Sequence, residues 1–383
     1  MSYITEKNRD DILKTAEFLH RHPELSSEEV MTTKFIKDKL SEMDIEIIDA
    51  PLKTGVVGII RGAHPGKTIA LRADIDALPV LEDASHEIRS ETDGVMHACG
   101  HDIHTASLLG AACGLKSFED SLHGNVMFVF QPAEEISLGA KEIIDSKVFD
   151  IIKPDAFFSM HVMPNIPNGQ IGIRQGSIMA GQTGFKVTVH GKGGHGSAPH
   201  TACDPIIAVA RIIDALQSLT ARENDPFSPC VLSVCTMHGG SAINIIPDDA
   251  YFAGTCRFLD NNRSQGIKER IEQIASKTAE VHNCRAEVEF FRELPALNND
   301  KDLASVAEKA ATSVFGEENV FSQLPMMASE DFPFFNEIAP VFMYHVGIGG
   351  NYPLHNSKIH IPEDSAVKSA ELFINTVLTY LQN

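Results

Sequence analysis

The chain has 383 residues, 43% of them hydrophobic, and a formal net charge of -20 at pH 7. This length exceeds one ordinary hydrophobic core, so two domains are expected, and the acidic balance argues against nucleic acid or an anionic membrane as a partner. No run approaches the roughly 18 apolar residues of a membrane span, the polar start predicts no signal peptide, and the scattered cysteines suit the cytoplasm.

The first part of the chain alternates helices with strands. Hydrophobic periodicity predicts, in chain order, helices at 10–22 and about 27–43, strands at 56–60 and 68–75, a buried helix at 102–116, a buried strand at 125–131, a helix at about 138–146 and a strand at 156–162. Such alternation is typical of an α/β layer structure.

The pattern changes near residue 180. The next elements are strands at 185–191, 231–237, 251–258 and 286–291, with helices at about 204–220 and 263–282. That β-α-β-β-α-β order fits a ferredoxin-like α+β sandwich. A helix at 301–315, a strand at 341–347 and a terminal helix from about 363 then resume the α/β character. We therefore predict an α/β catalytic domain in two parts, 1–180 and 293–383, interrupted by an inserted domain at 181–292.

Polar side chains follow several of the apolar strands in the α/β part. They are Asp74 and Asp76 after TIALRA (68–73), Glu134 and Glu135 after 125–131, His161 at the end of 156–162, and His355 after 341–347, with Cys99 and His101 opening the buried helix. Ligands of open α/β sheets bind outside the carboxyl ends of the strands, so these groups could converge there. Thiolate, imidazole and carboxylate are ligands of zinc and its neighbours.

Each of these residues also has an ordinary structural explanation. Cys99 taken alone is more often a packed core thiol. His101 could have no role beyond capping a helix, and the paired glutamates could belong to a solvated loop. Their joint occurrence at successive strand ends favours one shared metal site over independent coincidences. Five ligands exceed one tetrahedral zinc, which predicts two metals with a bridging ligand and leaves one glutamate as a general base.

The motifs that hold these residues resemble the M20 metallopeptidase family, specifically its amidohydrolase subfamily of aminoacylase and hippurate-hydrolase type. The matching stretches are RADIDALP (72–79), MHACGHDIHT (96–105), QPAEE (131–135), MHVMP (160–164), GKGGHGSAPH (191–200), GGSAINIIPD (239–248), GTCRF (254–258), SEDF (329–332) and LHNSKIHIPED (354–364). They occur in family order and span nearly the whole chain. The resemblance implies a metal-dependent exopeptidase-like catalytic domain with an inserted dimerisation or lid domain.

The resemblance also implies a ligand set. Its members are Cys99 as the thiolate that bridges two metals, and His101, Glu135, His161 and His355 as the other ligands. In the wider family the strand motif reads His-x-Asp and its histidine is a ligand. This chain has Arg72 at that position, so the resemblance implies that His101 replaces the missing ligand.

The remaining matches imply catalytic and binding roles. Glu134 would be the general base, and Asp74 a carboxylate that orients a ligand histidine. In the inserted domain, His195 would donate to the oxyanion and bind substrate, either within its own chain or by reaching across a dimer into the partner's site. Asn244 and Arg257 would bind the substrate carboxylate or help the oxyanion, and a guanidinium suits a carboxylate because it binds bidentately.

These implications define the expected activity. It is metal-dependent hydrolysis of N-acetyl or N-aroyl amino acids to a carboxylate and a free amino acid, by a cytoplasmic homodimer with two divalent ions per chain, drawn from Zn, Mn, Co and Ni. The alternatives are a metallo-dipeptidase or aminopeptidase on short peptides, a non-catalytic metal-binding relative, and a cysteine enzyme with Cys99 as nucleophile. The sequence ranks neither acyl groups nor amino acids. His97 and His104 receive no role beyond a supporting or structural one.

Overall fold

The computed structural model describes residues 3–382 and divides into two compact units. The first unit contains the chain up to Gly176, residues 298–324 and the chain from Asp331 onward, and the second contains Ser177–Leu297 and Pro325–Glu330. The last of these segments falls inside the range 293–383 that the sequence analysis gave to the catalytic domain. It lies with the second unit because its backbone bonds there, with the N–H of Met326 donating to Ile178 O at 2.9 Å.

The first unit is built on a mixed eight-stranded sheet in the order β1-β2-β4-β3-β5-β16-β6-β15. Its strands are β1 (Glu46–Ile47), β2 (Val56–Arg61), β3 (His64–Asp74), β4 (His123–Gln131), β5 (Ala156–Met163), β6 (Ile171–Ile173), β15 (Val320–Ser322) and β16 (Val341–Gly347). The central strands β4, β3, β5 and β16 run parallel. Every residue of β5 and β16 is buried, as expected of strands that are covered on both faces.

Seven α-helices of the described chain belong to the first unit. They are α1 (Glu6–Arg21), α2 (Val30–Glu42), α3 (His101–Lys116), α4 (Gly139–Asp145), α5 (Val148–Ile151), α8 (Lys301–Phe315) and α9 (Asp364–Leu381). α3 packs against both α1 and α9, so nearly all of its residues are buried. The expected buried helix is therefore present, and its N-terminus starts at His101, inside the candidate site.

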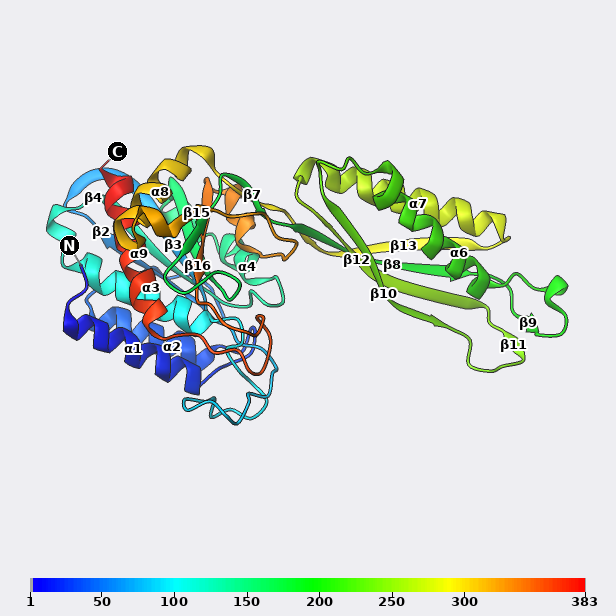
Figure 1. The fold of residues 1–383 in the computed structure, drawn as a ribbon, viewed down its shortest axis with the longest axis horizontal. Coiled ribbons are helices and arrows are strands. Elements are labelled where there is room, and N and C mark those ends of the chain that lie inside the picture. The colour runs from blue at the N-terminus through cyan, green and yellow to red at the C-terminus, as the bar shows by residue number, and fades with distance from the viewer. Residues whose placement is uncertain (1–2, 383) are drawn as a thin grey trace. The chain divides into compact units, whose positions relative to one another are not determined.

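The second unit is an antiparallel four-stranded sheet in the order β10-β12-β8-β13, with both helices packed on one face (Figure 1). Its main elements are β8 (Gly181–His190), α6 (Pro205–Ser218), β10 (Cys230–Gly239), β12 (Asp249–Phe258), α7 (Ser264–Val281) and β13 (Arg285–Leu294). The expected β-α-β-β-α-β order is confirmed. Apolar side chains of β8 and β12 pack against α6 and α7 in a core separate from that of the first unit.

Two short two-stranded sheets complete the described structure. One pairs β9 (Gly194–His195) with β11 (Ile245–Ile246), and the other pairs β7 (Gly176–Met179) with β14 (Leu297–Asn299). Within residues 3–382, no helix combines the length and the apolar character that crossing a bilayer requires.

Candidate active site

The structure brings the five predicted metal ligands together at the carboxyl ends of the central strands. Their ligand atoms form two groups, Cys99 with His101 and His161, and Cys99 with Glu135 and His355, and within each group all lie within 4.8 Å of one another. Cys99 belongs to both groups, which is the position that a bridging ligand needs. Cys99 Sγ lies 3.5 Å from His161 Nε2, and His355 Nε2 lies 3.5 Å from Glu135 Oε1.

Tight backbone turns aim these side chains. Gly100, between Cys99 and His101, has a φ of 83°, and a Cβ there would lie 2.5 Å from Val162 Cγ2. Only glycine fits this position, because it tolerates the left-handed region and brings no side chain. His355 itself has a φ of 65°. A residue other than glycine is costly in that region, and such strain is concentrated at functional sites.

Hydrogen bonds fix which ring nitrogen of each histidine faces the cluster. His101 Nδ1 lies 2.8 Å from Asp76 O, and His161 Nδ1 lies 2.8 Å from Val162 O. A backbone carbonyl only accepts, so both Nδ1 atoms donate and the neutral rings present a bare Nε2. A neutral imidazole with a bare nitrogen, held from behind by a carbonyl or carboxylate, is the usual form of a metal-binding histidine.

The charges around His101 favour a cation at the cluster. Burial alone lowers the pKa of His101, but Asp74, Asp76 and Glu135 together raise it to about 10. Burial and the same two aspartates raise the pKa of Glu135 to about 7. His101 Nε2 and Glu135 Oε1 lie 3.9 Å apart, and both are buried without a hydrogen-bond partner among the described residues. This orphaned pair, together with a sulfur, nitrogen and oxygen donor set, fits divalent transition metals.

Asp76 has a structural role that the sequence analysis did not assign. Its Oδ1 lies 3.2 Å from His101 Nδ1, and its Oδ2 accepts from Ser26 Oγ at 2.6 Å and from the N–H of Glu135 at 3.0 Å. One buried carboxylate therefore holds two predicted ligands. The available signal was its place beside Asp74 at the end of the same strand.

Asp74, expected to orient a ligand histidine, bonds a different ring. Its Oδ1 accepts from His104 Nδ1 at 2.6 Å, and its Oδ2 lies 3.6 Å from His101 Nε2. The histidine whose orientation Asp74 fixes is therefore His104, which the sequence analysis left without a role. The acceptor behind the predicted ligand His101 is Asp76.

Glu134, the predicted general base, is buried beside the cluster with 8% of its surface exposed. Its carboxylate lies within 4.8 Å of the ligand atoms of His101 and Glu135. The preceding residue, Ala133, has a φ of 53°, and its N–H donates to Glu29 Oε1 at 2.8 Å. This turn lets two adjacent glutamates approach the same centre.

The predicted residues of the inserted domain lie in the second unit, at opposite ends of its sheet. His195 on β9 pairs with Ile245, directly after Asn244, and both His195 and Asn244 are exposed. Arg257 lies near the end of β12, where its Nη1 donates to Met327 O and to Ser329 Oγ at 2.9 Å each. Along β12, Arg257 is about 26 Å from Asp249 at about 3.3 Å per residue, and Asp249 pairs with His190, close to β9. The structure therefore does not bring Arg257 together with His195 and Asn244.

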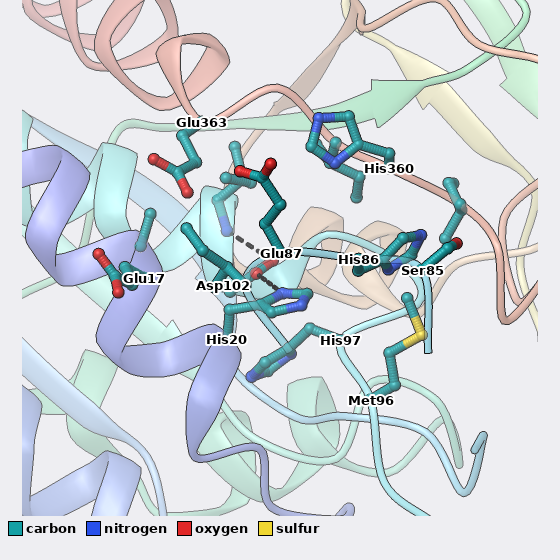
Figure 2. Close-up of a pocket in the computed structure, with 15 residues that line it drawn as sticks. Glu17, His20, Ser85, His86, Glu87, Met96, His97, Asp102, His360 and Glu363 are labelled. Atoms are coloured by element: carbon teal, nitrogen blue, oxygen red, sulfur yellow. Dashed lines mark hydrogen bonds and ion pairs between the residues drawn. The ribbon is translucent and has the colours of Figure 1, made fainter. Parts of the chain in front are cut away.

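A cavity of about 410 Å³ lies beside the start of α3 (Figure 2). Its polar lining residues are Glu17, His20, Ser85, His86, Glu87, His97, Asp102, His360 and Glu363. His20 bonds Asp102 Oδ2 at 2.7 Å and Glu82 Oε1 at 3.0 Å, which ties α1 to the helix that carries His101. His97 is 2% exposed and lines this cavity, while the described lining includes none of the predicted ligands.

Comparison with known proteins gives consistent matches over nearly the full length. A family model described as peptidase family M20/M25/M40 matches residues 70–379. An N-acetylcysteine deacetylase of Bacillus subtilis is 38% identical over 95% of each chain. A thermostable carboxypeptidase of Saccharolobus solfataricus is 40% identical over 94% of this chain and 95% of its own. A hippurate hydrolase of Campylobacter jejuni is 36% identical over 95% of each chain.

Solved structures show the same likeness. A Bacillus subtilis protein described as a dinuclear metal binding peptidase from the M20 family superposes with a TM-score of 0.88, at 34% identity over 99% of both chains. That description applies to a protein with the same two-unit fold. It matches the two ligand groups that meet at Cys99 in this chain.

Proposed function

Because this chain belongs to the peptidase family M20/M25/M40 and is a hydrolase of amide bonds, we propose that it cleaves N-acyl amino acids to a carboxylate and a free amino acid. The observation that carries this proposal is the buried cluster around Cys99, with Glu134 beside it. Relatives named N-acetylcysteine deacetylase and hippurate hydrolase support acetyl and aroyl groups as the acyl part.

Two divalent ions per chain are part of the proposal. Cys99 would bridge them, with His101 and His161 on one side and Glu135 and His355 on the other, as the two groups of ligand atoms suggest. Zn, Mn, Co and Ni all accept such a mixed donor set. When bound, the ions would polarise the acyl carbonyl and lower the pKa of water in the site.

The residues of the chain would then move the proton. Glu134 takes a proton from the attacking water and returns it to the leaving nitrogen, so that the products are a carboxylate and an amine. Its burial and its closeness to the ligand atoms of His101 and Glu135 support this role. Asp76 holds His101 and the Glu134–Glu135 loop in register through its bonds to His101 Nδ1 and the N–H of Glu135.

The residues of the second unit would serve a site formed by two chains. One small substrate cannot touch both ends of a sheet that separates Arg257 from His195 by more than 20 Å, as estimated from about 3.3 Å per residue. We therefore assign His195 and Asn244 to the site of a partner chain in a homodimer, where His195 donates to the oxyanion. Arg257 keeps its Nε and Nη2 for a substrate carboxylate, because its bonds to Met327 O and Ser329 Oγ use Nη1.

A substrate panel on metal-reconstituted protein tests this function. We expect hydrolysis of N-acetyl and N-benzoyl amino acids, loss of activity with a chelator, and recovery when the metal is restored. Short peptides form the comparison arm, because a relative named carboxypeptidase supports a peptidase as the second candidate. Faster cleavage of dipeptides than of acyl amino acids would replace the proposed substrate class. Full activity in excess chelator would instead favour Cys99 as a nucleophile.

A further inference from the structure

Arg72 is a fully buried cation at the centre of the first unit's sheet, two residues before the end of β3. Its guanidinium donates from Nη1 to Asp74 Oδ2 at 2.7 Å, from Nη2 to Asp331 Oδ1 at 3.2 Å, and from Nε to Gln131 Oε1 at 2.8 Å. Asp331 is fixed in turn by the N–H of Ala140 at 3.0 Å. Such a fork holds its acceptors in one geometry, which a lysine would not reproduce.

Asp74 is one of several carboxylates that flank His101. His101 Nε2 lies 3.6 Å from Asp74 Oδ2, and Cys99 and His161 supply ligand atoms within 4.8 Å of His101, so an ion bound at Nε2 could sit on either side. The Asp74 side is a credible metal site by itself, because the ligand atoms of Asp74, His101 and His104 lie within 4.8 Å of one another. Nothing in the distances alone decides between the two sides.

Hydrogen bonds distinguish the two sides of His101, because they already occupy the acceptor atoms on the Asp74 side. Asp74 Oδ2 accepts from Arg72, and Asp74 Oδ1 accepts from His104 Nδ1 at 2.6 Å. The N–H of Val162 donates to His104 Nε2 at 3.1 Å, so the neutral ring carries its proton on Nδ1, facing Asp74. On the other side, His161 Nδ1 donates to Val162 O, so its neutral ring presents a bare Nε2, which lies 3.5 Å from Cys99 Sγ.

We propose that Arg72 is a positioning residue that keeps Asp74 and His104 out of the metal centre and so leaves the ion at His101 to Cys99 and His161. A buried carboxylate needs a compensating cation, and Arg72 supplies a fixed one to Asp74. A divalent ion at His101 then gains less from Asp74, whose charge Arg72 already compensates, than from the Cys99 thiolate. This inference rests on the proposed metal-dependent function, because it concerns where that function's ions bind.

Cobalt titration of the metal-free protein tests the inference without measuring hydrolysis. The Co(II) visible spectrum reports the ligands, and equilibrium dialysis reports the number of ions bound. For R72Q we expect a changed spectrum and at least a tenfold change in affinity for one ion, because Asp74 becomes available at His101. The double variant R72Q/D74N should regain the wild-type spectrum. The control R61Q removes an exposed arginine that pairs with Glu46, and it should match wild type.

If R72Q does not fold, a second variant still tests the inference. D74N removes the carboxylate but leaves Arg72 paired with Asp331, and because Asp74 is not a ligand in this inference, two Co(II) ions with the wild-type spectrum are expected. Loss of an ion in D74N, or an R72Q that folds and is indistinguishable from wild type, would overturn the inference. Wild type that binds two ions but hydrolyses no acyl amino acid would reject the proposed function alone, since the cobalt result still stands.

Discussion

Two regions carry the predicted functional residues: the ligand cluster around Cys99 in the first unit, and the tip of the second unit, which holds His195 and Asn244. The two regions are built in opposite ways. His101 is fully buried, with Nδ1 fixed by Asp76 and carboxylates around Nε2. His195 is exposed, and its Nδ1 bonds its near neighbour Ser197, whose Oγ lies 2.7 Å away. The first set is preorganised within one chain. The second lacks the low-dielectric surroundings that make an oxyanion donor effective, which is why we propose that a partner chain completes it.

The largest expected effect comes from removing the proton acceptor beside the cluster while keeping every predicted metal ligand. Glu134→Gln keeps the shape of the side chain but cannot accept the proton of the attacking water. We expect kcat to fall by about 10²- to 10⁴-fold. Glu142→Gln, which alters an exposed glutamate on α4, is the matched control and should retain full activity. A near-normal kcat in Glu134→Gln with two ions bound would remove Glu134 from its role.

A change at the tip of the second unit should be nearly as damaging, yet leave the metal sites intact. For His195→Ala we expect kcat to fall by about 10²- to 10³-fold through loss of an oxyanion donor, with unchanged metal content and Tm. Mixing His195→Ala with Glu134→Gln then tests whether two chains form one site. Mixed dimers would hold one intact site of two, which restores about one quarter of wild-type activity after random exchange. If His195 acted within its own chain, mixing would restore nothing.

The support behind the ligands should matter less than the ligands themselves. Asp76→Asn weakens the bonds to His101 Nδ1 and to the N–H of Glu135. We expect metal affinity to fall by about 10- to 100-fold, as for other groups that orient ligand histidines. Isothermal titration with zinc measures the change, and excess metal should restore most of the activity. Unchanged affinity would mean that the carbonyl of Asp76 alone fixes His101.

The smallest expected effect is a pH dependence of the stability of the first unit, caused by the partly buried charges of His20 and Glu82. Burial lowers the pKa of His20, but Asp102 and Glu82 raise it from 6.5 to about 10, so its contribution to stability is complete below pH 6.5 and is lost as the pH rises toward 10. Burial raises the pKa of Glu82, but His20 and His86 lower it from 4.5 to about 2. That contribution is present above pH 4.5 and is lost as the pH falls toward 2.

Thermal unfolding across pH checks this pH dependence. Between about pH 5 and 6.5 both contributions are complete, and Tm should decline on either side by about 2–4 °C for each kcal/mol lost. His20→Asn should flatten the alkaline decline, because it removes the group whose proton is lost. An alkaline decline of equal size in His20→Asn would show that another group is responsible.

Much of the fold could be predicted from local patterns. The alternation of buried strands with helices, the change to two-residue periodicity in β8 and the β-α-β-β-α-β order are all visible in the sequence, because burial on one or both faces dictates the spacing of apolar residues. Pro325–Glu330 could not be assigned this way. Its place in the second unit depends on backbone bonds such as that from the N–H of Met326 to Ile178 O.

The candidate site, too, could be predicted from the sequence only in part. The sequence by itself determined which residue types meet at the strand ends, since the order of Cys99, His101, Glu134, Glu135, His161 and His355 along an α/β chain leaves one edge where they can converge. Only the tertiary structure decided that Asp76 rather than Asp74 holds His101, that Arg72 engages Asp74, and that Arg257 lies far from His195. These outcomes depend on side-chain direction and strand length in space, which residue spacing along a chain does not encode.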